Sequence, residues 1–230
     1  MKTDTLAIHG GFAGDGGSGA SAVPIYQTVS YAYNTAQGLA DAFAGKSPGY
    51  IYTRIANPTT TALETRLTEL EDGIGCIATS SGMAAIASVV MGLAGAGDHI
   101  VAAAGIFGGT VSLFENTLAR FDIKTTLVDV AETNNFANAI NSRTKLIFIE
   151  TIGNPRMDVP DIPAVAEIAH KAGIPLIVDS TVTTPVLFRP GEFGADIVVH
   201  STSKFINGHG TAIGGAIIDA GNYDWRNGAF

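Results

Sequence analysis

The chain has 230 residues, of which 46% are hydrophobic and 15% are charged, with 28 glycines and a formal net charge of −8. High apolar content without a glycine period excludes a disordered or collagen-like chain, and the absence of a basic cluster argues against binding to nucleic acid or an anionic membrane. The single cysteine, Cys76, excludes an internal disulfide and fits a reducing compartment. Residues 1–8 lack a signal-type apolar core, and the most apolar stretch, residues 83–97, is too short and glycine-rich to span a membrane. We therefore expect a soluble cytoplasmic protein.

Residues 1–60 predict an irregular N-terminal arm. They contain a glycine-rich piece at residues 10–19, several tyrosines and no long helical or strand period. We predict at most one short helix here, near residues 38–44. Because such an arm has no apolar face of its own to bury, we expect it to contact a neighbouring subunit.

Residues 61–230 predict one α/β domain in which short apolar strands alternate with helices. The strands are expected at residues 75–79, 100–103, 124–128, 146–149, 176–178, 197–199 and 212–218, and the helices at residues 59–70, 81–93, 110–120, 134–140 and 161–172. This alternation indicates a mostly parallel sheet covered by helices on both faces. Because ligands of such sheets bind at the carboxyl ends of the strands, the residues that follow each strand are the candidate site.

The first candidate is a phosphate site at Ser81, Gly82 and Met83, which open a helix directly after a predicted strand. Free N–H groups and the helix dipole favour an anion at such a helix N-terminus. The alternative is an ordinary serine N-cap.

Two further candidates follow the strands at residues 176–178 and 197–199. A carboxylate at Asp179 needs a partner if it is buried, and a protonated pyridine nitrogen would supply a charge-assisted hydrogen bond; a turn-capping Asp is the alternative. Lys204 comes after the hydroxyl residues Ser201 and Ser203. The hydroxyls are candidate phosphate donors, and the amine could form an imine with an aldehyde cofactor and then transfer protons.

The last two candidates are weaker when each is taken alone. Tyr52 and Arg54 alternate, so an extended segment would direct both to one side as a phosphate clamp; a solvated Arg beside a packed Tyr is the alternative. Phe107 could stack on a flat ring or could be a core residue before a turn. Taken together, the candidates supply a phosphate site, a ring stacker, a partner for a pyridine nitrogen and an imine lysine, which are the groups that pyridoxal 5′-phosphate (PLP) needs.

The segment His-Ser-Thr-Ser-Lys-Phe-Ile-Asn-Gly-His-Gly at residues 200–210, together with Asp179, resembles the Cys/Met-metabolism PLP-dependent enzymes. This family includes cystathionine γ-synthase, cystathionine lyases, methionine γ-lyase and O-acetylhomoserine sulfhydrylase. The resemblance extends over nearly the whole chain. It is strongest to the O-acetylhomoserine sulfhydrylase branch in four stretches, at residues 22–28, 107–114, 152–155 and 210–215.

The resemblance implies a fold type I PLP-dependent transferase large domain, in a homo-oligomer with active sites shared between chains, such as a homotetramer. It implies that Lys204 is the Schiff-base lysine and that Asp179 pairs with the pyridine nitrogen. The other implied cofactor-binding residues are Ser81, Gly82, Met83, Phe107, Asn154, Ser201 and Ser203, with Tyr52 and Arg54 reaching the phosphate of a neighbouring subunit. No metal site is expected. The implied reaction is γ-replacement on O-acetyl-L-homoserine by sulfide or a thiol, as part of methionine biosynthesis.

The chain departs from the family pattern in two ways. Phe107 stands where the family usually has Tyr, so a phenol hydroxyl is lost. The smaller C-terminal domain of the family, which supplies the arginine for the substrate carboxylate, is expected to be absent from these 230 residues, so that the chain alone is expected to be inactive. The alternatives are therefore a γ-lyase or cystathionine γ-synthase activity, or a non-catalytic homologue that acts in assembly or regulation.

Overall fold

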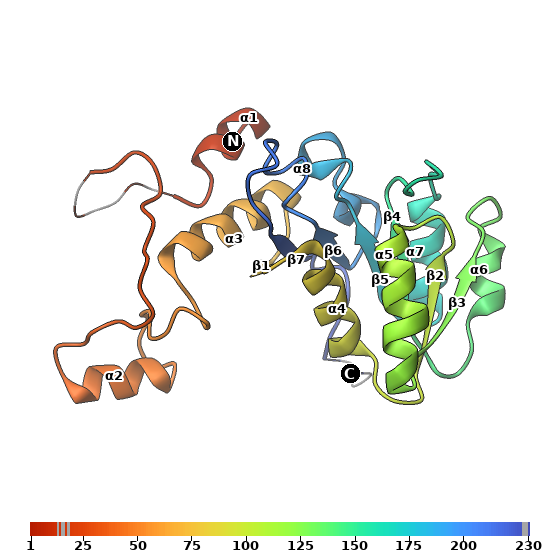
Figure 1. Cartoon of the computed structure of the whole chain (residues 1–230), viewed down its shortest axis with the longest axis horizontal. Helices are drawn as coiled ribbons and strands as arrows, with labels where there is room; N and C mark the ends of the chain where they lie inside the picture. The colour runs from red at the N-terminus through yellow and green to blue at the C-terminus, as the bar shows by residue number, and fades with distance from the viewer. Residues whose placement is uncertain (13, 15–16, 18, 227–229) are drawn as a thin grey trace.

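The computed structural model describes residues 1–12, 14, 17, 19–226 and 230, and within them seven strands form one sheet (Figure 1). The strand order is β1-β7-β6-β5-β4-β2-β3. The strands are β1 (Gly75–Thr79), β2 (His99–Ala103), β3 (Lys124–Val128), β4 (Thr144–Glu150), β5 (Leu176–Asp179), β6 (Ile197–His200) and β7 (Gly215–Asp219). Neighbouring strands are parallel except for β7, which is antiparallel to both β1 and β6. The predicted mostly parallel sheet is confirmed.

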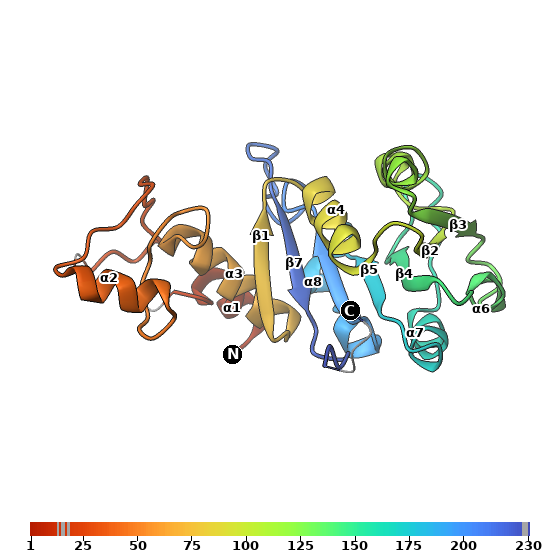
Figure 2. The same ribbon diagram turned by 90° about the horizontal axis from the view of Figure 1, so that it is seen from below.

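Helices cover both faces of this sheet, as predicted. The α-helices are α1 (Thr3–His9), α2 (Ala36–Phe43), α3 (Pro58–Glu71), α4 (Gly82–Leu93), α5 (Gly108–Ser112), α6 (Asn134–Ala139), α7 (Ile162–Lys171) and α8 (Thr184–Leu187). Figure 2 shows α4 and α7 on opposite sides of the strands. All residues of β2 and β6 are buried, because strands covered on both faces need apolar side chains in both directions. In the described part of the chain, no helix is long and apolar enough to cross a membrane.

Capping residues set where the helices that flank the site begin. Asn57 accepts a hydrogen bond from the Thr59 N–H at 2.9 Å and precedes Pro58, a residue suited to the first helical turn, so α3 begins there. Asp161 caps α7 in the same way, accepting from the Ala164 N–H at 3.1 Å. Each cap satisfies a backbone donor that the helix itself leaves unpaired.

The N-terminal arm differs from its prediction in one respect. Besides α2, which was expected, the arm contains α1, and the prediction of at most one short helix was wrong. The tertiary structure stabilises α1: it packs on α3, and the Arg66 side chain of α3 donates to the Gly10 carbonyl at 2.7 Å, where α1 ends. Helix α2 lies far from the sheet in both views (Figures 1 and 2).

Two other elements differ from their predicted form. The helix predicted at residues 110–120 begins earlier, as α5, and continues as a π-helix, η1 (Leu113–Thr117), and a 3₁₀ helix, η2 (Leu118–Phe121). The last strand is shorter than the predicted residues 212–218. The Ser203 hydroxyl holds the backbone of Gly214 through bonds of 3.0 and 3.2 Å, so the chain enters the sheet only at Gly215.

A buried ion pair joins the end of α3 to the end of β6. His200 Nε2 lies 2.5 Å from Glu71 Oε1, and both side chains are almost completely inaccessible to solvent. Within the described residues, His200 Nδ1 and Glu71 Oε2 have no hydrogen-bond partner. If the pair is broken, the group that remains therefore has no other hydrogen-bond partner among the described residues.

Replacing Glu71 with alanine is expected to lower the free energy of unfolding by about 3–5 kcal/mol, because the mutation leaves His200 buried and unpaired. Urea unfolding followed by far-UV circular dichroism would measure the loss. The matched control is Glu69→Ala, which removes an exposed carboxylate from the same helix and is expected to change stability by no more than about 0.5 kcal/mol. Equal losses in the two variants would contradict a stabilising role for the pair.

Candidate active site

A pocket of about 630 Å³ opens at the carboxyl ends of the parallel strands. Nine of the eleven residues predicted to bind a cofactor line it, and they come from the end of β5 and from the segments that follow β1, β2, β4 and β6. They are Ser81, Gly82, Met83, Phe107, Asn154, Asp179, Ser201, Ser203 and Lys204. The structure thus brings together residues that are up to 123 positions apart, from Ser81 to Lys204 (204 − 81).

The N-terminus of α4 forms one wall of this pocket. The Ser81 hydroxyl accepts the Ala84 N–H at 3.1 Å, so Ser81 is the helix cap, and Gly82 and Met83 line the pocket beside it. A Cβ atom on Gly82 would lie 2.5 Å from Ser201 Cβ, so glycine allows α4 to approach the loop after β6. Helix-terminal N–H groups beside the serine hydroxyls make this wall suitable for an anion.

Asp179 lies at the end of β5 with one carboxylate oxygen engaged. Its Oδ1 accepts bonds from the Thr181 N–H at 2.9 Å and the Thr181 hydroxyl at 2.5 Å. Burial raises the pKa of Asp179 above its usual value, while these two bonds and the nearby His200 act in the opposite direction. The hydrogen bonds found among the described residues leave Oδ2 available to a cationic donor in the pocket.

Lys204, Ser201 and Ser203 line the pocket from the segment that follows β6. In the part of the chain that the structure describes, the Lys204 amine makes no ion pair. The Ser203 hydroxyl already bonds the backbone of Gly214, whereas the Ser201 side chain makes no such contact with the described residues. Ser201 is therefore the more available hydroxyl donor.

Phe107 forms an open edge of the pocket. The residue is 47% exposed and stands at the start of α5, just after β2. A Cβ atom on Gly109 would lie 2.5 Å from the Phe107 ring, so the glycine gives the ring room to lie over the first turn of the helix. The ring is thus placed to cover a planar ligand.

Glu150 also lines the pocket, and the sequence analysis missed it. It is the last residue of β4, is 6% exposed and stands in register with Asp179 on β5. Burial, with a smaller effect from the charge of Asp179, raises the pKa of Glu150 to about 8. The signal was present in the sequence, because Glu150 follows the apolar run at residues 146–149 just as Asp179 follows its own strand.

Tyr52 and Arg54 do not line this pocket. The segment is not extended as predicted, because the Tyr52 carbonyl accepts the N–H groups of Ile55 and Ala56 and closes a turn. The two side chains nevertheless meet, with the Arg54 guanidinium 5.2 Å from the centroid of the Tyr52 ring. Tyr52 is 40% exposed, so the pair is accessible from outside the subunit.

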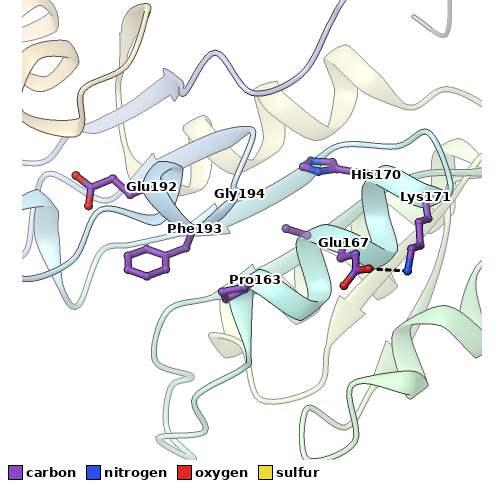
Figure 3. Close-up of a pocket in the computed structure, with 8 residues that line it drawn as sticks. Pro163, Glu167, His170, Lys171, Glu192, Phe193 and Gly194 are labelled. Atoms are coloured by element: carbon purple, nitrogen blue, oxygen red, sulfur yellow. Dashed lines mark ion pairs between the residues drawn. The ribbon is translucent and has the colours of Figure 1, made fainter.

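A second hollow of similar volume, about 640 Å³, lies between α7 and the 3₁₀ helix η3 (Pro190–Phe193) (Figure 3). Its charged groups include the exposed pair Glu167 and Lys171, one helical turn apart at 2.6 Å. An exposed pair of this kind is typical of a solvated helix surface, so volume alone does not identify the active site. The convergence of polar groups at the strand ends favours the pocket around Lys204.

The shape and chemistry of this pocket fit PLP. It offers an anion site at α4, a free carboxylate oxygen on Asp179, an aromatic ring at its edge and an amine on Lys204. The sheet with these groups at its carboxyl edge defines a PLP-binding α/β domain. A family model for Cys/Met metabolism PLP-dependent enzymes matches residues 4–229, and the chain belongs to this family.

Similar proteins carry related activities. The chain is 44% identical over 230 residues to O-acetyl-L-homoserine sulfhydrylase from Leptospira meyeri, covering 100% of this chain and 52% of that protein. It is also 44% identical over 220 residues to L-methionine gamma-lyase from Porphyromonas gingivalis, covering 95% and 55%. A crystal structure from Campylobacter jejuni that contains N′-pyridoxyl-lysine-5′-monophosphate matches with a TM-score of 0.91 and 38% identity, over 95% of this chain and 54% of that one. The chain spans about half the length of the curated relatives it matches.

Proposed function

We propose that the protein catalyses γ-replacement on O-acetyl-L-homoserine by sulfide or a thiol. With hydrogen sulfide the products would be homocysteine and acetic acid. The observation that carries the proposal is that Lys204, Asp179 and the N-terminus of α4 meet in one pocket of a Cys/Met metabolism PLP-dependent domain. The similarity to the sulfhydrylase of Leptospira meyeri supports the choice of substrate.

In this proposal, the residues of the pocket would hold PLP by three contacts. Gly82, Met83 and Ser201 would bind its phosphate, Asp179 Oδ2 would pair with its ring nitrogen, and Lys204 would bond its aldehyde carbon. Ser81, Ser203 and Asn154 would support these contacts from the same walls. PLP, when bound, supplies the electron sink that makes the substrate Cα–H bond acidic.

The protein's own residues would then move and hold protons. The substrate amino group would displace Lys204 from the cofactor, and the freed Lys204 Nζ would accept the proton from the substrate Cα. This amine faces no competing ion pair among the described residues. Asp179 would keep the ring nitrogen protonated, and Phe107 would exclude water from one face of the ring. Loss of a proton from Cβ would then expel acetate from Cγ, and the sulfur nucleophile would add to Cγ as protons return to Cβ and Cα.

Product analysis tests the proposal. The complete protein encoded by the gene, supplied with O-acetyl-L-homoserine, sulfide and PLP, is expected to form homocysteine with one equivalent of acetate. Supplied with L-methionine, it is expected to release little α-ketobutyrate. If α-ketobutyrate were the main product, the protein would be a γ-lyase, for which the similarity to the Porphyromonas gingivalis lyase is the supporting observation.

A cystathionine γ-synthase would use the same scaffold and would be detected by adding L-cysteine in place of sulfide.

A non-catalytic homologue is the candidate from a different class. Phe107 supports it, because the residue lacks the phenol hydroxyl that the family usually has at this position. A purified protein without the visible absorption of lysine-bound PLP would favour that candidate.

We further propose a cytoplasmic homo-oligomer whose active sites are shared between two chains, in a dimer or a tetramer of such dimers. The arm supports this proposal, because Ile25, Val29 and Ile55 are exposed there. In a two-fold dimer, Tyr52 and Arg54 of one chain would reach the phosphate in the other chain's pocket, which makes two equivalent composite sites. The single Cys76 fits the reducing cytoplasm.

Mixing two inactive variants is expected to restore activity. Arg54→Ala and Lys204→Ala each remove one half of a composite site, so a mixed dimer keeps one complete site. Refolding the two together at equal amounts should restore roughly a quarter of wild-type activity, since half of the dimers are mixed. The control is Asp179→Asn mixed with Lys204→Ala, which alter the same half and should not complement each other. An absence of recovery in the first mixture, despite confirmed subunit exchange, would mean that Arg54 does not act across the dimer.

A further inference from the structure

Glu150 is a buried acid that touches two of the pocket segments. Its Oε1 accepts the Phe107 N–H at 2.8 Å, and its carboxyl also bonds the backbone of Asn154. Phe107 lies in the segment after β2, directly before α5, whereas Asn154 lies in the turn after β4. One carboxyl group at the end of β4 thus joins the two loops that carry these pocket residues.

The position of Glu150 in the sheet explains why a carboxyl group lies here. β4 runs between β2 and β5, so its last residue stands next to the loop that leaves β2 and next to Asp179 on β5. The side chain is almost fully buried, so these backbone bonds have little competition from water. A backbone N–H that lost this acceptor would be left partly unsatisfied at the edge of the core.

We propose that Glu150 is a positioning residue, which sets the place of the Phe107 ring and of Asn154 through their backbone N–H groups. The inference rests on the proposed function, because it concerns the pocket in which PLP would lie. Glu150 itself would not touch the reacting atoms. Its effect on the cofactor would pass through Phe107 and Asn154.

The protonation state of Glu150 determines which substitution should preserve its role. Burial and the neighbouring Asp179 raise its pKa to about 8, so the group is mostly neutral at pH 7. The other titratable groups around this end of the sheet include Lys204, which lines the same pocket, and His200 at the end of β6. Asp158, which pairs with Arg156 at 3.3 Å, lies against Gly105 in the loop after β2. A neutral Glu150 would leave Asp179 as the carboxyl group that pairs with a cationic ring nitrogen. Glutamine, which is neutral and has a carbonyl oxygen at the same reach, is therefore expected to replace it.

Measuring the affinity for PLP distinguishes two possible roles of Glu150. The residue could position the loops by hydrogen bonds, or the site could require its negative charge. Glu150→Ala in the complete protein is expected to weaken PLP binding by at least about tenfold, which corresponds to about 1.4 kcal/mol, and to alter the circular dichroism of the bound cofactor. Glu150→Gln is expected to recover most of this loss and to stay within about threefold of wild type. Glu167→Gln is the matched control, because Glu167 is an exposed glutamate of α7 (Figure 3) and does not line the pocket.

Unfolding of the apoprotein gives a readout that does not depend on the cofactor. A raised folded-state pKa stabilises the protein fully below the usual value of 4.5, and this stability is lost as pH rises through about 8. Glu150→Gln has no such titration. The ratio of the unfolding constants of wild type and Glu150→Gln should therefore change by about tenfold per pH unit between about pH 5 and pH 7 and level off above about pH 9.

The outcomes distinguish this inference from the proposed function. A wild-type protein that fails to bind PLP would contradict the proposed function, and the apoprotein titration and hydrogen exchange at the Phe107 amide would still test Glu150. Faster exchange in Glu150→Ala than in Glu150→Gln supports the inference. If wild type binds PLP and Glu150→Ala binds it equally well, the inference is wrong. If Glu150→Gln is as defective as Glu150→Ala, charge rather than hydrogen bonding is what the site requires, and the inference is again wrong.

Discussion

Replacing Lys204 with alanine is expected to abolish turnover by the complete protein and to remove the visible absorption of lysine-bound PLP. The variant loses both the amine that would bond the cofactor and the base that would take the Cα proton. A loss of at least about 10³-fold in kcat is expected, within the range for removal of a positioned proton-transfer group. Because Lys204 makes no ion pair among the described residues, its removal should leave the fold intact.

Absorption spectra and steady-state rates with O-acetyl-L-homoserine and sulfide measure both effects. The matched control is Lys171→Ala, which removes an exposed lysine of α7 that pairs with Glu167. This control should keep the spectrum and the rate of wild type. A Lys204→Ala protein that kept both the absorption band and a near-normal rate would contradict the central assignment.

Replacing Asp179 with asparagine is expected to slow Cα deprotonation by about 10- to 100-fold, the equivalent of a charged hydrogen bond worth about 1.5–3 kcal/mol. A neutral amide cannot stabilise a protonated ring nitrogen, so the electron sink weakens. The fold should persist, because the amide oxygen can still accept the two bonds from Thr181 that Oδ1 accepts now.

Exchange of the substrate Cα hydrogen with solvent deuterium, followed by NMR, isolates this step from the departure of acetate. Asp161→Asn serves as a control, because asparagine caps a helix about as well as aspartate and α7 starts away from the pocket. An exchange rate in Asp179→Asn equal to that of wild type would rule out the proposed pairing with the ring nitrogen. The same variant also removes a charge that raises the pKa of Glu150, so that pKa should fall toward its usual value.

Local sequence was sufficient to predict the sheet and most of the pocket. Short apolar strands separated by helices require burial on both faces, and this pattern predicted the mostly parallel sheet that the structure has. Because parallel strands end at the same edge, the rule of inspecting the residue after each strand identified Asp179 and Lys204 before their distance in space was known. The rule succeeded because it needs only the direction in which each strand runs, and this direction follows from the order of the residues.

Contacts between segments that are far apart in the chain determined the features that the sequence did not predict. Helix α1 is stabilised by α3 and the start of β7 by the Ser203 hydroxyl, and neither contact leaves a periodic pattern in the sequence. Glu150 is the clearest case. Its place after an apolar strand was visible in the sequence, but its bond to Phe107, 43 residues away, exists only because β2 and β4 are neighbours in the sheet. Burial beside Asp179, which gives Glu150 its raised pKa, likewise arises only when β4 and β5 pair.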